Sequence, residues 1–106
     1  MRFRKRESGA PPVDLVGLTL SHRDGATERL DRETARGIAE ALDLILFRGI
    51  GEADVAGWGV YLGEHGDRIV LDGYEVEFPL VELTRGQAVT LGIGLARAVT
   101  TLRAVA

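Results

Sequence analysis

The stretch TRGQAVTLGIGLARAVTTLRAV, residues 84–105, decides the fold. Thr84 and Gln87 form a capping box, in which each side chain accepts a hydrogen bond from the other residue's backbone N–H. The spacing predicts a helix from Arg85 to about Val105. Its main apolar stripe repeats at three- and four-residue steps, as expected for a helix packed on a core, and consists of Ala88, Leu91, Leu95, Ala98, Val99 and Leu102.

This helix is apolar over more of its surface than one sheet face covers. Val89, Ile93 and Ala96 widen the stripe, and Gly92, Gly94 and Ala96 allow another backbone to approach closely. A helix that is apolar nearly all round is buried on nearly all sides. Two explanations stay open: the surplus residues pack on a second copy or another protein, or they contact the other helix of the same chain. On the first explanation, the interface consists of Val89, Gly92, Ile93 and Ala96.

The other helix is expected to begin after Asp31. A carboxylate at the N-cap accepts hydrogen bonds from the exposed amides of the first turn. Arg48 followed by Gly49 predicts the end of this helix. The apolar residues at helical spacing are Ala35, Ile38, Ala39, Leu42, Ile45 and Leu46, and the opposite face carries Arg36, Glu40 and Asp43.

Alternating apolar and polar residues predict strands at 13–22, 58–62, 68–71 and 74–78, with a short returning strand at 26–30. Residues 50–57 are expected to form a loop, and Asp72-Gly73 favours a tight hairpin. The element order is β-β-α-β-β-β-α. The sequence therefore predicts an α+β, two-layer domain, an antiparallel sheet of about five strands with two helices on one face. The sheet's other face would be solvated or covered by a partner.

Length and composition limit the domain organisation. The chain has 106 residues, of which 45% are hydrophobic and 27% charged, and no cysteine. This composition is globular and supplies neither disulfides nor thiolate metal ligands. We expect a single domain over residues 13–106 and a flexible basic arm over residues 1–12. Because charges interrupt the most apolar window, residues 88–106, we expect a cytoplasmic protein and no membrane span.

The basic arm carries Arg2, Arg4, Lys5 and Arg6, whereas residues 7–106 hold nine cations against sixteen anions. A cationic arm on an acidic body is able to contact phosphates, and such binding weakens as salt is added. Short cationic termini are also common as solvated segments. Arginine outnumbers lysine twelve to one and asparagine is absent, which indicates a GC-rich gene, bacterial or from a phage.

The sequence offers few candidate residues for catalysis or ligand binding. His22 and His65 both lie beside predicted turns, where histidine is usually a solvated surface residue. A phosphate-binding loop requires closely spaced glycines between the end of a strand and the N-terminus of a helix. The closely spaced glycines of this chain are not expected in that position. No group of residues has the sequence spacing that is typical of a metal-binding site. The sequence therefore predicts no catalytic residue, no metal and no cofactor.

Three functions follow from these observations. The leading hypothesis is a non-catalytic protein–protein interaction or assembly module, self-associating or docking through the apolar helix or the open sheet face, in a bacterial or phage accessory protein. A second is a nucleic-acid-associated regulator that uses the basic arm. A third is a small enzyme with a site near the hairpin turns, formed by His22, Asp24, Trp58, His65 and Asp67.

Overall fold

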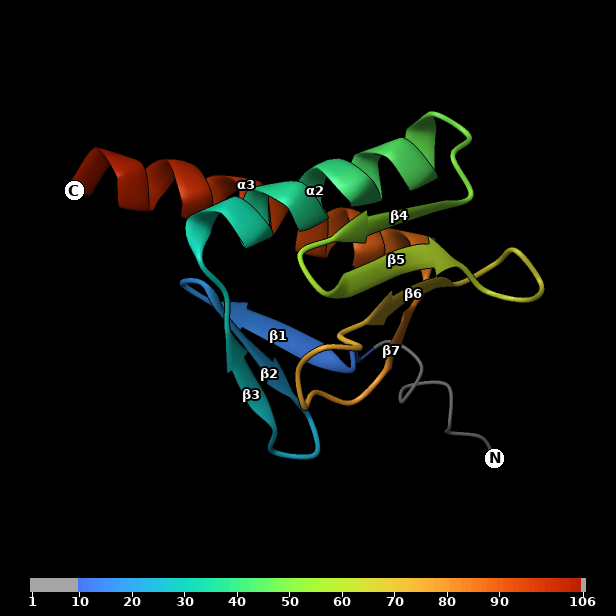
Figure 1. The fold of residues 1–106 in the computed structure, drawn as a ribbon, viewed down its shortest axis with the longest axis horizontal. Helices are drawn as coiled ribbons and strands as arrows, with labels where there is room; N and C mark the ends of the chain where they lie inside the picture. The colour runs from blue at the N-terminus through green and yellow to red at the C-terminus, as the bar shows by residue number, and fades with distance from the viewer. Residues whose placement is uncertain (1–9, 106) are drawn as a thin grey trace.

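A computed structural model describes residues 10–105 of the chain, and the side chains of residues 10–101. The elements follow one another as β1 (Val13–Val16), β2 (Thr19–His22), β3 (Thr27–Arg29), α2 (Arg32–Phe47), β4 (Glu52–Val55), β5 (Trp58–Leu62), β6 (Ile69–Asp72), β7 (Val81–Leu83) and α3 (Arg85–Val105). Figure 1 shows the two helices together on one side and the strands on the other.

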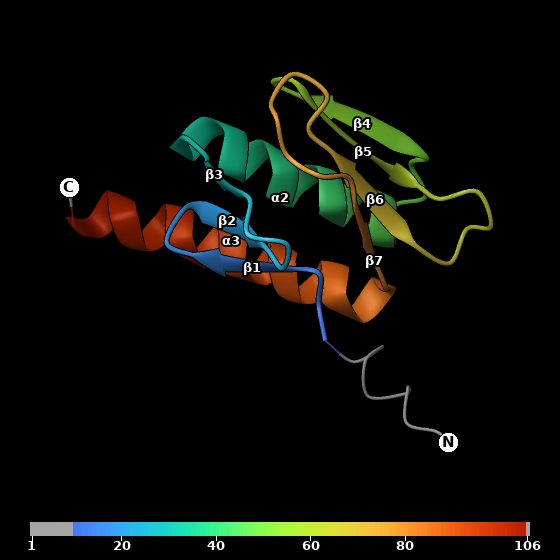
Figure 2. The same cartoon turned by 90° about the horizontal axis from the view of Figure 1, so that it is seen from below.

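The strands form two antiparallel sheets, one of order β1-β2-β3 and one of order β4-β5-β6-β7. The α+β class is confirmed, whereas the single five-stranded sheet and its element order are wrong. The helices α2 and α3 lie side by side and run in opposite directions (Figures 1 and 2). Helix α2 packs on β4 and β5, and α3 contacts β1 and β7. Each sheet therefore rests mainly on a different helix.

The predicted strand 13–22 is a hairpin. Val16 pairs with Thr19, so Gly17 and Leu18 form a two-residue loop. Gly17 has φ +62°, a conformation that glycine adopts without the steric penalty of a Cβ atom. The predicted returning strand 26–30 is present as β3. The region 50–57, expected to be a loop, contains β4, whose Val55 packs against Gly37 of α2.

The predicted strand 74–78 is also wrong, because these residues form consecutive turns between β6 and β7. The amide of Tyr74 donates to the Asp72 carbonyl (2.9 Å) and that of Val76 to the Gly73 carbonyl (3.1 Å). Only Phe78 is buried, where it contacts Trp58 and His22. The alternation of apolar and polar residues therefore belongs to a folded loop, and the last strand is β7.

Both helices have the predicted boundaries. The Asp31 side chain accepts from the Thr34 amide (2.8 Å), and Gly49 follows the C-cap with φ +77°. The capping box of α3 forms through Thr84 and Gln87, at 3.0 and 3.1 Å. Arg85 also donates through Nη2 to the carbonyl of Leu46 (2.9 Å), which ties the start of α3 to the end of α2.

One continuous hydrophobic core lies between the helices and both sheets. Its largest fully buried side chain is Trp58, and Leu20, Ile38, Leu71 and Leu95 are buried with it. Pro12 is also buried and its carbonyl accepts from the Arg23 amide (3.0 Å), so the packed structure includes residues just before β1. Among the described residues, no helix has the length and apolar character needed to span a membrane.

Candidate functional site: the groove between α2 and α3

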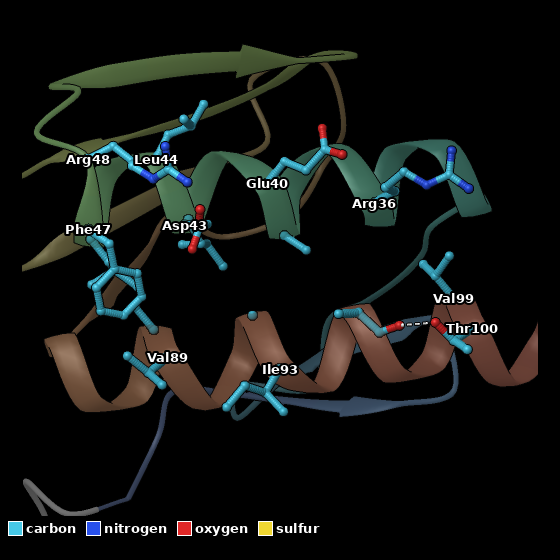
Figure 3. A pocket seen from close by; sticks show the side chains of 16 residues that line it. Arg36, Glu40, Asp43, Leu44, Phe47, Arg48, Val89, Ile93, Val99 and Thr100 are labelled. Atoms are coloured by element: carbon cyan, nitrogen blue, oxygen red, sulfur yellow. Dashed lines mark hydrogen bonds between the residues drawn. The ribbon is translucent and has the colours of Figure 1, made fainter.

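A groove of about 840 Å³ runs between α2 and α3 on the side of the helices away from the sheets (Figure 3). We call it the α2–α3 groove. It is lined by Arg36, Ala39, Glu40, Leu42, Asp43, Leu44, Leu46, Phe47 and Arg48 from the α2 side, and by Ala88, Val89, Gly92, Ile93, Ala96, Val99 and Thr100 from α3. Most of the surface that lines the groove is apolar.

All four residues of the sequence-predicted interface line this groove, but they do so differently. Gly92 faces α2, since a Cβ atom there would lie 3.8 Å from Cβ of Leu42. Val89 is partly buried against the core. Ile93, by contrast, is 50% exposed, and Ala96 is exposed beside it. Contact with the other helix thus accounts for Gly92, and it leaves Ile93 and Ala96 facing solvent.

Helix α2 contributes two exposed apolar side chains that the sequence reasoning missed. Phe47 is 66% exposed and Leu44 is 39% exposed. In Figure 3, Phe47 points from α2 toward Val89. A signal for Phe47 was present in the sequence, because it lies four residues after Asp43 and seven after Glu40, on the polar face of the helix. An apolar patch of this kind is typical of an interaction surface.

Four charged side chains follow the α2 side of the groove in the order Arg36, Glu40, Asp43, Arg48. None of them makes an ion pair within the part of the chain that the structure describes. The α3 side has no charge, since Val89, Ile93, Ala96 and Thr100 form its outward row. The groove therefore combines an apolar wall with a charged wall whose net charge is zero.

The remaining predicted site residues are not assembled into one site. Arg2, Arg4, Lys5 and Arg6 lie outside the described residues. His65 and Asp67 lie in the β5–β6 turn, which Figures 1 and 2 place apart from the β2–β3 turn that holds Asp24 and follows His22. No group of three or more metal-ligating side chains occurs among residues 10–101.

His22 is partly buried and packs against the edge of the core. Its ring packs edge-on against Phe78, with ring centroids 5.9 Å apart, and Phe78 contacts the buried Trp58. Nδ1 of His22 lies 3.1 Å from both the amide nitrogen and the Oδ1 atom of Asp24. When Nδ1 carries no proton, it accepts a hydrogen bond from the Asp24 amide. When it carries a proton, it faces the Asp24 carboxylate. In either state the contacts hold the β2–β3 turn.

A second, smaller depression lies beside β4, β5 and β6 and includes Glu52, Asp54, Tyr61, Asp72 and Tyr74. The Tyr74 hydroxyl donates to Oδ1 of Asp54 at 2.6 Å. This bond to a carboxylate, followed by burial and the charges of neighbouring acids, raises the pKa of Tyr74 to about 12. The bond joins the loop after β6 to β4, which gives it a structural role.

Comparison with known proteins adds no relative: no family model, no curated protein and no solved structure matches this chain.

Proposed function

We propose that this chain is a non-catalytic protein–protein interaction module and that the α2–α3 groove is its docking surface. The observation that carries the proposal is the exposure of Phe47 (66%) and Ile93 (50%) on opposite walls of one groove. Removing apolar surface of this kind from water is favourable by about 25 cal/mol per Å², which offsets part of the cost of association. Exposed side chains that create such a patch are therefore better explained by docking than by folding.

The surroundings of the groove support this proposal over an active site. The groove holds no histidine, and its carboxylates Glu40 and Asp43 lie on one exposed helix face. Catalytic acids and bases are usually placed in enclosed sites that perturb their pKa values. The open, apolar groove offers contact area instead.

No observation on the described residues supports the nucleic-acid hypothesis or the enzyme hypothesis. The nucleic-acid hypothesis depends on residues outside the described part of the chain. The enzyme hypothesis depends on two turns that lie apart. Both stay predictions, and the first is tested by measuring whether nucleic-acid binding weakens with salt and is lost without residues 1–12.

Site-specific photo-crosslinking tests the proposed function. A photoreactive phenylalanine analogue at Ala96, in the groove, is exposed to an extract of the source cells, and the matched control carries it at Thr101, exposed on the same helix but outside the groove. We expect protein adducts at position 96 and none above background at 101. Equal adducts at both positions, or none at 96, would contradict the proposal.

A further inference from the structure

We propose that the occupant of the α2–α3 groove is the same groove of a second copy of this chain, packed face to face about a two-fold axis. This inference rests on the proposed function and names its partner. A two-fold interface must be self-complementary: if residue i contacts residue j of the other copy, then j contacts i in return. Both walls of the groove meet this condition at one position of the axis.

On α2, the self-complementary feature is a charge pattern centred on Leu44. Glu40 and Arg48 lie four residues to either side of it, roughly 6 Å along the helix. When two copies of α2 pack antiparallel with the axis at Leu44, Glu40 of each copy lies level with Arg48 of the other. Neither side chain has an ion-pair partner within the described residues of its own chain.

On α3, the self-complementary feature is the uncharged outward row around Val89. An axis at this level places Val89 of each copy against Val89 of the other. Phe47, which points toward Val89 within one copy, lies beside the same contact (Figure 3). Uncharged side chains thus meet uncharged side chains along α3.

The two centres lie level across the groove. Gly92 of α3 packs against Leu42 of α2, and Arg85 reaches the carbonyl of Leu46, so numbers rise along one helix as they fall along the other. These contacts place Leu44 opposite residues 87–90, the level of Val89. A single axis across both helices therefore satisfies the charge pattern of α2 and the apolar pattern of α3 together.

The size of the face is comparable with a small protein interface. Helix α2 has 16 residues, about 24 Å of helix, and a pair of helices is roughly 20 Å wide, which gives a projected face of about 500 Å². A standard interface buries roughly 800 Å² per partner, so this face supplies the larger part of one.

One contact opposes association. Asp43 points from α2 toward α3 in Figure 3 and lies one residue from the proposed axis, so its carboxylates approach each other in the dimer. We expect Asp43→Asn to lower the dimer dissociation constant several-fold, because removing a like-charge pair favours association. An unchanged or higher constant would contradict this position of the axis.

A charge swap tests the proposed pairing, with the dissociation constant measured by sedimentation equilibrium on the full chain. Glu40→Arg and Arg48→Glu each convert two attractive contacts into repulsive ones and should raise the constant roughly tenfold. The double variant should restore it to within about threefold of the original value. Residues 40 and 48 are two helical turns apart in one chain, so rescue requires contact between copies.

A wild-type chain that does not self-associate, or a double variant no better than the single ones, overturns the inference. The proposed function has a separate readout. If crosslinking at Ala96 captures a different protein while the chain stays monomeric, the groove docks another partner and only the inference fails. If position 96 captures nothing, not even a second copy, both fail.

Discussion

At the scale of single residues, Ala56 carries the only positive φ of a non-glycine residue in the described chain, at +46°. It forms the two-residue loop between β4 and β5 with Gly57, whose φ is +89°. Such loops favour asparagine followed by glycine, because both positions require positive φ. A Cβ atom at Gly57 would also lie 2.9 Å from the side chain of Glu75. A stabilising substitution in this loop is therefore expected only at Ala56.

Ala56→Asn should therefore raise the free energy of unfolding by about 1 kcal/mol, since left-handed backbone penalises alanine more than asparagine. Urea denaturation would show a higher midpoint with an unchanged slope. Gly57→Ala is the contrasting variant and should lower the midpoint. A destabilised Ala56→Asn variant would contradict the loop conformation.

The hydrogen bond from Tyr74 to Asp54 predicts a pH dependence at alkaline pH. Folding raises the pKa of Tyr74 from 10.0 to about 12. Because the folded value lies above the unfolded one, the stabilisation is fully present below pH 10 and is lost as the pH rises toward 12. Ultraviolet titration of tyrosinate should show one delayed tyrosine in the native protein. Asp54→Asn should reduce the delay, and an undiminished delay would contradict the bond.

At the scale of elements, both helices could be predicted from local chemistry because their ends carry caps. Asp31, Thr84 and Gln87 act on amides within three residues of themselves, so their effect is readable without knowledge of the fold. The turn at Gly17 was missed because a period-2 pattern continued through it. The loop 74–78 was missed because its alternation matches a strand, whereas contacts of Phe78 and Gly73 with distant Trp58 decide its shape.

The candidate site was predictable on α3 and only in part on α2, where Phe47 falls on the polar face. Surplus apolar residues stand out on a long helix, which is how Ile93 and Ala96 were selected. The role of Gly92 depends on its contact with Leu42, and the exposure of Phe47 depends on how α3 lies beside α2. Those facts come from tertiary packing, which a sequence pattern does not contain.

The contact between α2 and β4 gives a prediction about helix glycines. A Cβ atom at Gly37 would lie 2.6 Å from Cγ1 of Val55, a stiff β-branched side chain. Gly37→Ala should therefore destabilise the protein by about 1 kcal/mol, although alanine is the better helix former. Gly86→Ala is the matched control: it meets no atom within 4 Å and should stabilise by about 0.5 kcal/mol. Thermal unfolding compares them, and a stabilising Gly37→Ala would rule out the close contact.

At the scale of the whole molecule, the two helices cover the sheets with one face and expose the groove with the other (Figure 1). The core is complete without Ile93, which is half exposed, so its replacement should leave the fold intact. This separation between folding and docking allows one substitution to change association alone.

Molar mass in solution tests most directly whether the groove docks a second copy. Light scattering after gel filtration, at low and high salt, should give twice the 11.4 kDa chain mass for the wild type and for Thr101→Glu. Ile93→Glu should give a folded species of 11.4 kDa, because a buried, unpaired carboxylate disfavours the interface. A wild type of 11.4 kDa at every concentration, or a dimer that Ile93→Glu leaves intact, would contradict self-association through this groove.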